Sequence, residues 1–256
     1  MGTPRIHEEI QDTGATMESL LLDFDHRYHN FFQSDVFIWF NMFNCYCFGG
    51  QSSENVLKKF LSSGKIALLT DPPFGGRVEP LAYTIHKLIQ MCKHCSDADV
   101  LVFWIFPYFM EPKVLSVCPS FTMLDYKVGY ENHKDFKNNK KSSKNGSPIR
   151  IFSNIEPSKF PLPVSEGYSL CKICNRWVSM ENKHCKKCRG CMSKDGQTYI
   201  HCDTCRKCVK PTWKHCNICE LCSHPDHLCP SQMVDARDNS HPIPHKKPRN
   251  KYYNRV

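Results

Sequence analysis

A dense run of cysteines and histidines near the carboxyl end most constrains what this 256-residue chain can fold into. Twelve of its 17 cysteines and five of its 13 histidines fall between Cys171 and Cys229. No stretch resembles a signal peptide, and the histidines recur at regular intervals among the cysteines. The pattern therefore favours metal binding in a reducing compartment over a secreted disulfide scaffold. So short a segment cannot bury a sufficient apolar core, and we expect bound metal to stabilise its fold.

The spacing of these residues divides them into four sets of three cysteines and one histidine. Two of the sets share the spacing C-x2-C-x9-H-x6-C, and each set begins before the previous one ends, so the predicted sites interlock. The four sets are Cys171, Cys174, His184 and Cys191; Cys185, Cys188, His201 and Cys208; Cys202, Cys205, His215 and Cys222; and Cys216, Cys219, His227 and Cys229. Tetrahedral Cys3His coordination with every position filled is typical of structural zinc, so we predict about four zinc ions.

Two alternatives to this grouping stay open on spacing alone. The fourth set is less regular than the others, and His224 competes with His227 for its histidine position. Contiguous groupings also compete with the interlocked ones, for example Cys188, Cys191, His201 and Cys205. The presence of zinc is therefore a firmer prediction than the individual pairings.

Strand-like and helix-like segments alternate through the part of the chain that precedes the cysteine-rich region. Buried strands are predicted at 19–24, 35–43, 65–70 and 100–106, and helices at 54–64 and 78–95. Such alternation is typical of a mainly parallel sheet covered by helices. The longest apolar run, VLVFWIFPYFM, is too short to span a bilayer, so we expect a soluble chain with no membrane partner.

The pattern then changes, because two predicted strands follow each other with no helix between them. Segments 121–130 and 147–155 are joined by a polar loop, which predicts an antiparallel hairpin. A parallel sheet that ends in such a hairpin indicates an α/β fold of the Rossmann-type methyltransferase class. We predict this domain over 1–157, a proline-rich linker over 158–170, a zinc domain over 171–229 and a basic disordered tail over 230–256.

The stretch KIALLTDPPFGG at 65–76 ends a predicted strand in a turn that can neither continue the sheet nor cleanly begin a helix. Ligands of open α/β sheets bind at the carboxyl ends of the strands. There Asp71 and the carbonyl of Pro72 can accept hydrogen bonds from an amino group, and Pro73 restrains the backbone that positions them. Phe74 offers a flat face for a flipped base. This arrangement suits in-line attack by the amino nitrogen on a sulfonium methyl group. Correct positioning of the nitrogen would supply much of the rate enhancement.

Asp71-Pro72-Pro73-Phe74 also matches the catalytic motif of methyltransferases that act on adenine N6 or, in some relatives, on lysine. Together with GTPRIHE (2–8), SLLLDFDHRY (19–28), FNMFN (40–44), FWIFPYF (103–109) and the Cys/His array, it closely resembles one family. That family is the zinc-finger CCHC-type methyltransferases, which install N6-methyladenosine in large-subunit ribosomal RNA. The resemblance extends over nearly the whole chain as far as Cys229.

The resemblance implies where S-adenosylmethionine binds. Gly2, Thr3, Pro4 and Arg5 would form the loop after the first strand of the fold, and Asp23 or Asp25 would bind the ribose hydroxyls. Asn41 and Asn44 are candidates for the adenine or the amino-acid end of the cofactor, and Asp71 would face the transferred methyl group. The family carries a strand and a helix before GTPRIHE, amino-terminal zinc fingers and a further zinc knuckle after Cys229. We therefore expect this chain to be an amino-terminally truncated form whose sheet lacks its first strand.

The charge pattern predicts where RNA would bind. The net charge is +9, but eleven Lys/Arg against five Asp/Glu in 171–229 are largely offset when each zinc holds three thiolates. Loop 133–150, with six Lys/Arg and one acid, and tail 230–256, with six and two, are better candidates for phosphate contact. Trp177, Tyr199 and Trp213 can either stack on bases or pack between zinc sites.

These features favour an S-adenosylmethionine-dependent N6-adenine methyltransferase that acts on structured RNA, with ribosomal RNA and ribosome-biogenesis proteins as partners. The resemblance implies location in the nucleus, the nucleolus and the cytoplasm. Two alternatives remain. One is a protein-lysine methyltransferase, because the same turn serves both acceptors, and the other is a catalytically inactive, zinc-dependent RNA- or protein-binding fragment.

Overall fold

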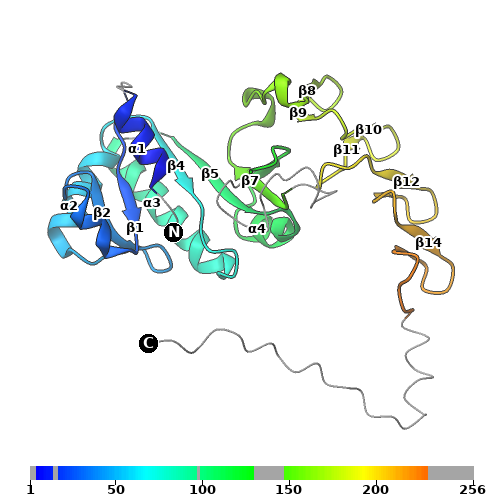
Figure 1. The fold of residues 1–256 in the computed structure, drawn as a ribbon, viewed down its shortest axis with the longest axis horizontal. Helices are drawn as coiled ribbons and strands as arrows, with labels where there is room; N and C mark the ends of the chain where they lie inside the picture. Colours follow the sequence, from blue (N-terminus) through cyan, green and yellow to red (C-terminus); the bar gives the residue numbers. More distant parts are fainter. Residues whose placement is uncertain (1–3, 14–16, 97–98, 130–146, 230–256) are drawn as a thin grey trace, which may run out of the picture. The chain divides into compact units, whose positions relative to one another are not determined.

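The computed structural model describes residues 4–13, 17–96, 99–129 and 147–229 (Figure 1). The chain divides into two compact units between Thr198 and Tyr199. Gly2 and Thr3, most of the predicted basic loop and the whole predicted basic tail lie outside the described residues. The first unit contains the predicted methyltransferase domain and the first zinc-ligand set. The domain boundaries read from the sequence remain a prediction.

The amino-terminal part of the first unit contains a three-stranded sheet. β1 (Leu21–Asp23) pairs in parallel with β2 (Phe37–Asn41), and β2 pairs antiparallel with β3 (Tyr46–Cys47). Two short helical segments, α1 (Arg5–Asp12) and η1 (His26–Asn30), flank β1 along the chain. The predicted strand at 35–43 is therefore confirmed, whereas α1 and β3 were not predicted.

A four-stranded sheet with the order β4-β5-β7-β6 carries the rest of the α/β fold. β4 (Ile66–Thr70) and β5 (Val100–Pro107) are parallel, and β7 (Ile149–Ser153) pairs antiparallel with both β5 and β6 (Thr122–Leu124). The predicted antiparallel pairing at the end of the sheet is thus confirmed. Trp104, Phe106 and Phe152 on its central strands are completely buried and form the middle of the core.

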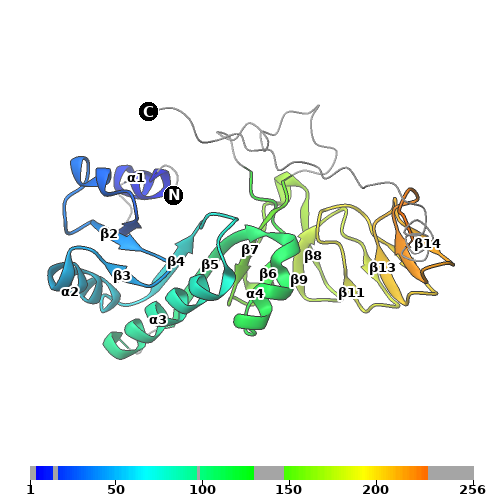
Figure 2. The same ribbon diagram turned by 90° about the horizontal axis from the view of Figure 1, so that it is seen from below.

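Helices cover both sides of these strands. α2 (Gly50–Leu61) and α3 (Val78–Ser96) lie on one side and α1 on the other (Figure 2). α3 buries Leu81, Ile85, Leu88 and Cys92, whose spacing of three and four residues places them on one helical face. α2 begins four residues before the predicted start at 54. Among the described residues no helix is both long and apolar enough to cross a bilayer.

The remaining segments are short. After β5 the chain forms η2 (Tyr108–Met110) and α4 (Glu111–Val117), and the proline-rich stretch after β7 forms η3 (Pro157–Lys159) and η4 (Val164–Glu166). Four antiparallel hairpins then follow: β8–β9 (Tyr168–Cys171 and Arg176–Ser179), β10–β11 (His184–Cys185 and Gly190–Cys191), β12–β13 (Ile200–Cys202 and Lys207–Val209) and β14–β15 (Lys214–Cys216 and Leu221–Ser223).

One prediction about the sheet was wrong. The run at 19–24 was expected to be a buried strand, but every residue of β1 is only half-buried. In β4, Leu69 is 44% exposed although the strand sequence is almost wholly apolar. The reason is that β1 and β4 end their respective sheets, so no described strand covers the edge that each turns away from its partner.

The hairpin β8–β9 is hydrogen-bonded to the four-stranded sheet through Asp125, which follows β6. Asp125 is 1% exposed, and its Oδ2 accepts hydrogen bonds from the Ser179 amide at 2.9 Å and the Asn182 side-chain amide at 2.8 Å. Asn182 in turn bonds both backbone groups of Ser193. Burial raises the pKa of Asp125, whereas these hydrogen bonds and the charges of two nearby arginines oppose the rise.

Further bonds join the same surfaces. The Arg176 guanidinium donates to the Met123 carbonyl at 3.0 Å, and the Tyr168 hydroxyl accepts from the Lys127 amide at 3.0 Å. Lys194 forms an ion pair with Glu111 of α4. The hairpin β8–β9 is therefore part of the same folded body as β6 and β7, although it also carries zinc ligands.

We expect Asp125→Ala to lower the free energy of unfolding of the first unit by about 2–4 kcal/mol, because it leaves two buried N–H donors without an acceptor. Urea denaturation followed by circular dichroism in zinc-containing buffer measures the change. Asp35→Ala, at an exposed acid, is the matched control and should change stability by less than about 0.5 kcal/mol. Equal stability of the two variants would contradict the anchoring role of Asp125.

Candidate active site and metal centres

The zinc hairpins explain why the ligand sets interlock. Within β10–β11, His184 lies directly across from Cys191, and these two residues complete the first set. The same hairpin carries Cys185 and Cys188, which begin the next set. β14–β15 repeats this arrangement, with His215 across from Cys222. β10–β11 and β14–β15 thus each complete one set with a cross-strand His/Cys pair and begin the next set with a C-x-x-C turn, whereas β8–β9 only begins the first set.

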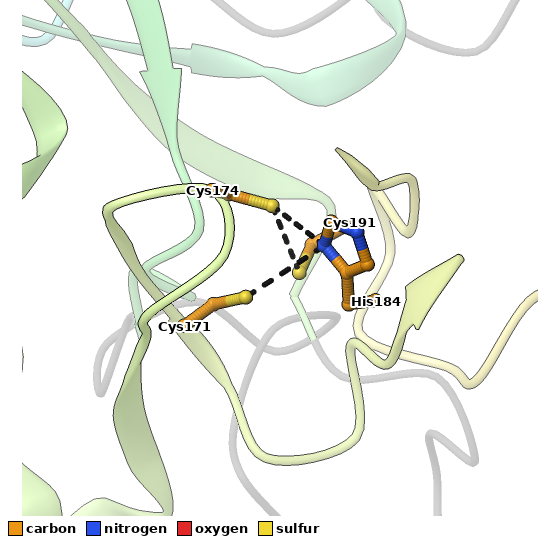
Figure 3. A group of neighbouring side chains, drawn as sticks. All are labelled: Cys171, Cys174, His184 and Cys191. Atoms are coloured by element: carbon orange, nitrogen blue, oxygen red, sulfur yellow. Dashed lines mark hydrogen bonds between the residues drawn. The ribbon is translucent and has the colours of Figure 1, made fainter. Parts of the chain in front are cut away.

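The first set is Cys171, Cys174, His184 and Cys191, and its ligand atoms lie within 4.8 Å of one another (Figure 3). The His184 Nδ1 atom lies 2.9 Å from the Cys174 sulfur and 3.8 Å from the Cys171 sulfur. The Cys174 and Cys191 sulfurs are 3.7 Å apart. The side chains of four residues from three strands and turns therefore converge on one point.

The third and fourth sets lie in the second unit and have similar geometry. In the third, the Cys205 sulfur is 3.2 Å from His215 Nδ1 and 3.4 Å from the Cys222 sulfur. In the fourth, His227 turns its Nε2 atom toward Cys219 at 3.3 Å and Cys229 at 3.2 Å. All four ligand atoms of each set lie within 4.8 Å of one another.

The structure decides between the two histidines that competed for the fourth set. His227 Nε2 joins the sulfurs, and His227 Nδ1 hydrogen-bonds the His224 carbonyl at 2.8 Å, which orients the ring. The His224 ring is 60% exposed and faces Asp226 instead. His227 is therefore the ligand candidate, and His224 supports it through its backbone.

The second predicted set has two members in each unit. Cys185 and Cys188 are close in the first unit, where the Cys188 amide donates to the Cys185 sulfur at 3.4 Å. In the second unit His201 and Cys208 are cross-strand partners in β12–β13, with Nδ1 and sulfur 4.0 Å apart. The grouping of these two pairs into one site remains a prediction from the sequence. The contiguous alternative fails, because Cys191 and Cys205 belong to the first and third sets.

A residue in the left-handed backbone conformation follows every C-x-x-C turn. The φ values of Asn175, Arg189, Arg206 and Glu220 lie between 50° and 54°. This conformation turns the chain sharply back into the following strand, and residues with a Cβ atom adopt it only when surrounding bonds enforce it. The same conformation at four equivalent positions indicates that all four C-x-x-C turns share one local structure. None of the four residues is glycine, so the position of the neighbouring cysteines, and not the flexibility of glycine, accounts for it.

The chemistry of the donor atoms fits zinc. Backbone amides of Cys219 and Ile218 lower the pKa of Cys216 to about 6, which favours a thiolate. A hydrogen bond with the Cys216 sulfur and burial raise the pKa of Cys229 to about 11, and repulsion from a Cys216 thiolate adds to the rise. A divalent cation among the sulfurs removes that repulsion and holds all three as thiolates. Three sulfurs and one imidazole nitrogen are the usual donors of structural zinc.

The predicted catalytic turn follows β4 directly, at the carboxyl end of that strand. Asp71 is exposed, whereas Pro72 is buried and fixes the base of the turn. The Gly76 amide donates to the Pro73 carbonyl at 2.8 Å, which closes a four-residue turn over Phe74 and Gly75. The half-buried Phe74 ring packs edge-on against Phe106 of the core, with centroids 6.0 Å apart.

The loop after β2 lies against this turn through the Phe43 ring, which is next to Gly76. A Cβ atom placed on Gly76 would lie 3.0 Å from the Pro73 carbonyl oxygen and 3.1 Å from the Phe43 ring, so only glycine fits there without displacement. Phe43 stands between the candidate residues Asn41 and Asn44, and it was not predicted as a site residue. Its position next to a turn 30 residues away depends on tertiary packing, and no local sequence signal indicates it.

The two acids after β1 have different surroundings. Asp25 caps η1: it accepts the Arg27 amide at 3.1 Å and pairs with the Arg27 guanidinium, whose hydrogen bond lowers the pKa of Asp25 to about 2. Asp23 ends β1 and accepts the Asp25 amide at 2.8 Å through Oδ1. Asp25 therefore has a structural role in shaping the loop, and Asp23 is the better candidate for binding a ribose.

The other candidate cofactor residues lie near the same strand ends or in α1. Asn41 ends β2, and its Oδ1 accepts the Phe43 amide at 2.9 Å, while Asn44 is exposed in the turn that follows. Pro4 precedes α1, and Arg5 in its first turn pairs with Glu9 at 2.9 Å. Asp23, Asn41 and Asp71 thus all occupy carboxyl ends of strands within the first unit, where α/β sheets bind ligands.

Comparison with known proteins matches this chain to one family. Residues 1–156 match the family described as “Probable N6-adenine methyltransferase”. The human protein named rRNA N(6)-adenosine-methyltransferase ZCCHC4 is 49% identical over 199 residues, which cover 73% of this chain and 39% of that protein. The protein of the same name from Bos taurus is 49% identical over 200 residues, and the one from Xenopus tropicalis is 48% identical over 196. The chain spans about two fifths of the length of these relatives.

We expect the purified chain to contain about four zinc ions, one for each Cys3His set. Inductively coupled plasma mass spectrometry of protein dialysed against metal-free buffer measures the ratio. A value near two would contradict the interlocked arrangement. Removal of zinc with a strong chelator should abolish the folded circular dichroism signal of the hairpins, because the metal supplies most of their folding free energy.

The two histidines near the end of the described chain allow a matched test of the fourth set. His227→Ala should remove about one zinc ion per chain, because it deletes a direct ligand. His224→Ala should leave the zinc content unchanged, because the bond to His227 uses the backbone carbonyl, which alanine retains. Loss of zinc from the His224 variant alone would reverse the assignment.

Proposed function

This chain belongs to the N6-adenine methyltransferase family, and we propose that it transfers a methyl group from S-adenosylmethionine to the N6 atom of adenine in structured RNA. The observation that carries the proposal is the Asp71–Phe74 turn at the carboxyl end of β4, on the same kind of strand end as Asp23 and Asn41. This is the location at which open α/β sheets bind their ligands.

In the proposed reaction the bound cofactor supplies a methyl group on a positively charged sulfur. The Asp71 carboxylate and the Pro72 carbonyl accept the two hydrogens of the adenine amino group and direct the nitrogen lone pair toward that methyl group. Pro72 and Pro73 restrict the backbone, so the two acceptors are positioned before the acceptor base arrives. Phe74, held edge-on by Phe106, provides the face on which the base stacks.

On the cofactor side, we assign the ribose hydroxyls to Asp23. Asp25 accepts hydrogen bonds from the amide and the guanidinium of Arg27 and stabilises the loop after β1. Asn41 and Asn44 are placed after β2 to contact the adenine or the amino-acid end of the cofactor. Pro4 and Arg5, with Gly2 and Thr3 before them, would contribute the remaining loop.

For the acceptor we propose ribosomal RNA of the large subunit. The relatives that share 48–49% identity carry rRNA methyltransferase names, and this supports the proposal. We propose further that the zinc hairpins help to hold the RNA, that ribosome-biogenesis proteins are partners, and that the protein acts in the nucleus, the nucleolus and the cytoplasm. The bonds around Asp125 support a role for the first hairpin in presenting RNA, because they attach it firmly to the catalytic sheet.

The experiment is transfer of tritiated methyl from S-adenosylmethionine to total RNA or to total protein. The chain should label RNA, and Asp71→Ala should reduce labelling at least about 100-fold while cofactor affinity changes only a few-fold, because the lost carboxylate acts on the acceptor amine. Asp35→Ala, at an exposed acid before the amino end of β2 that is not a candidate site residue, is the control and should retain normal labelling.

Each other outcome of this experiment contradicts the proposal. Label in protein instead of RNA would assign the turn to lysine methylation. Label that persists in the Asp71→Ala variant would refute the role of that carboxylate. RNA binding without transfer to either acceptor would leave a zinc-dependent binding module.

A further inference from the structure

The carboxyl end of β5 lies beside the candidate catalytic turn at 71–74. β4 and β5 run parallel, β4 ends across from Trp104, and β5 continues beyond this residue. The Phe74 ring of the turn packs against Phe106 in this last part of β5. The chain that leaves β5 therefore emerges next to the turn, at the edge of the sheet where α/β proteins bind ligands.

This part of the chain presents an exposed aromatic residue, Phe109. It belongs to η2 and follows Phe106 by three residues, so the two Cα atoms lie within about 11 Å of each other. The Phe109 side chain is 62% exposed, whereas the aromatic residues at 103–108 are buried or half-buried. Single exposed apolar side chains are common, but this ring combines its exposure with a fixed backbone and a place beside the catalytic turn.

Hydrogen bonds hold the backbone on either side of Phe109. The Tyr108 amide donates to the Pro148 carbonyl at 2.9 Å, which ties η2 to the segment that precedes β7. The Tyr108 carbonyl accepts the amide of Glu111, the first residue of α4, and this bond closes the turn that contains Phe109. The backbone of Phe109 is therefore fixed before any ligand binds, so little conformational entropy is lost there on binding.

The side chain of Phe109 is supported by two neighbours. Its ring packs edge-on against the Tyr108 ring, with centroids 5.7 Å apart. The Arg150 guanidinium lies over the Tyr108 ring, 5.9 Å from its centroid. Arg150 is completely buried, and its Nη1 atom donates to the Ser147 and Ile149 carbonyls, both at 2.8 Å. A buried cation therefore fixes the ring against which Phe109 packs.

A flat, exposed and rigid aromatic ring is a stacking surface for a nucleobase. Every base has a π face, so an aromatic side chain can hold unpaired bases with little regard to their identity. In the proposed reaction the target adenine leaves its base stack to reach the turn, and the base next to it then loses a stacking partner. An aromatic ring beside the turn can replace that partner.

We propose that Phe109 is a stacking platform for the unpaired base next to the target adenine. This inference rests on the proposed function and extends it to how the acceptor RNA is held at the same site. Phe74 stacks on the target base, and Phe109 stacks on its neighbour. Tyr108 and Arg150 are positioning residues, because they hold the platform without contact to RNA. The platform favours adenines in unpaired RNA and tolerates different flanking bases.

The test measures binding of the full chain to the fluorescein-labelled RNA UUUGAGUUU by fluorescence anisotropy. A second RNA has the same length but lacks the bases of both guanosines that flank the adenine. Phe109→Ala should weaken binding of the intact RNA at least about fivefold, because it removes the stacking of one base. It should change binding of the RNA with abasic positions less than about twofold, because that RNA has no neighbouring base to stack.

Two further variants and a salt titration make the comparison specific. Phe109→Trp should bind the intact RNA within about twofold of the unaltered chain, because an indole also offers a flat face. Tyr83→Ala removes a similarly exposed ring, at 54%, from α3 and should change binding of neither RNA. Phe109→Ala should leave the salt dependence of binding unchanged, because it removes no phosphate contact. Because both side chains are largely exposed, all three variants are expected to fold.

The outcomes separate the platform from a structural role of Phe109 and from the proposed function. Equal weakening of both RNAs by Phe109→Ala, or a changed salt dependence, would overturn the platform. Unchanged binding of the intact RNA, or failure of the unaltered chain to bind it, would also overturn it. Weakening that requires the flanking bases, without any methyl transfer to RNA, would leave the platform standing and count against the proposed function alone. Normal methyl transfer with no effect of Phe109→Ala would do the reverse.

Discussion

Cross-strand pairing of a histidine with a cysteine in three hairpins, β10–β11, β12–β13 and β14–β15, is the constraint on which the carboxyl part of the structure depends. Strands of two to four residues carry too little apolar surface to hold a fold together. Binding of thiolates and an imidazole to one cation would supply the folding free energy that a larger apolar core would otherwise provide. Within the first unit the first set joins β8–β9 to β10–β11, and within the second unit the third set joins β12–β13 to β14–β15, so each of these sets holds two hairpins together.

Asp125 connects the hairpin β8–β9 to the four-stranded sheet. A buried carboxylate is costly unless donors surround it, and here the donors come from the first zinc hairpin and from Asn182 beyond it. The sheet thus supplies a buried acceptor, Asp125 Oδ2, and the hairpin β8–β9 and Asn182 supply its donors. This arrangement joins the hairpin to the sheet that carries the Asp71–Phe74 turn.

The same sheet is incomplete along one line. β4 has the composition of a central strand but the exposure of an edge strand, and β1 faces it across a cavity with a similar mismatch. Strand ends at either side of this gap carry Asp23 and Asp71.

The sequence by itself determined the elements whose causes are local. Apolar periodicity predicted β2, β4, β5 and α3, turn chemistry predicted the end of β4, and the repeated spacing in Cys171–Cys229 favoured four interlocked ligand sets while leaving contiguous groupings and His224 open. The choice of His227 over His224, the contact of Phe43 with Gly76, the burial of Asp125 and the open edges of β1 and β4 were decided only by the tertiary structure. Most of these features depend on contacts between residues that are distant in the chain, and sequence periodicity does not indicate which distant residues meet. The two histidines are close in sequence and both fit the ligand spacing, so spacing does not distinguish them.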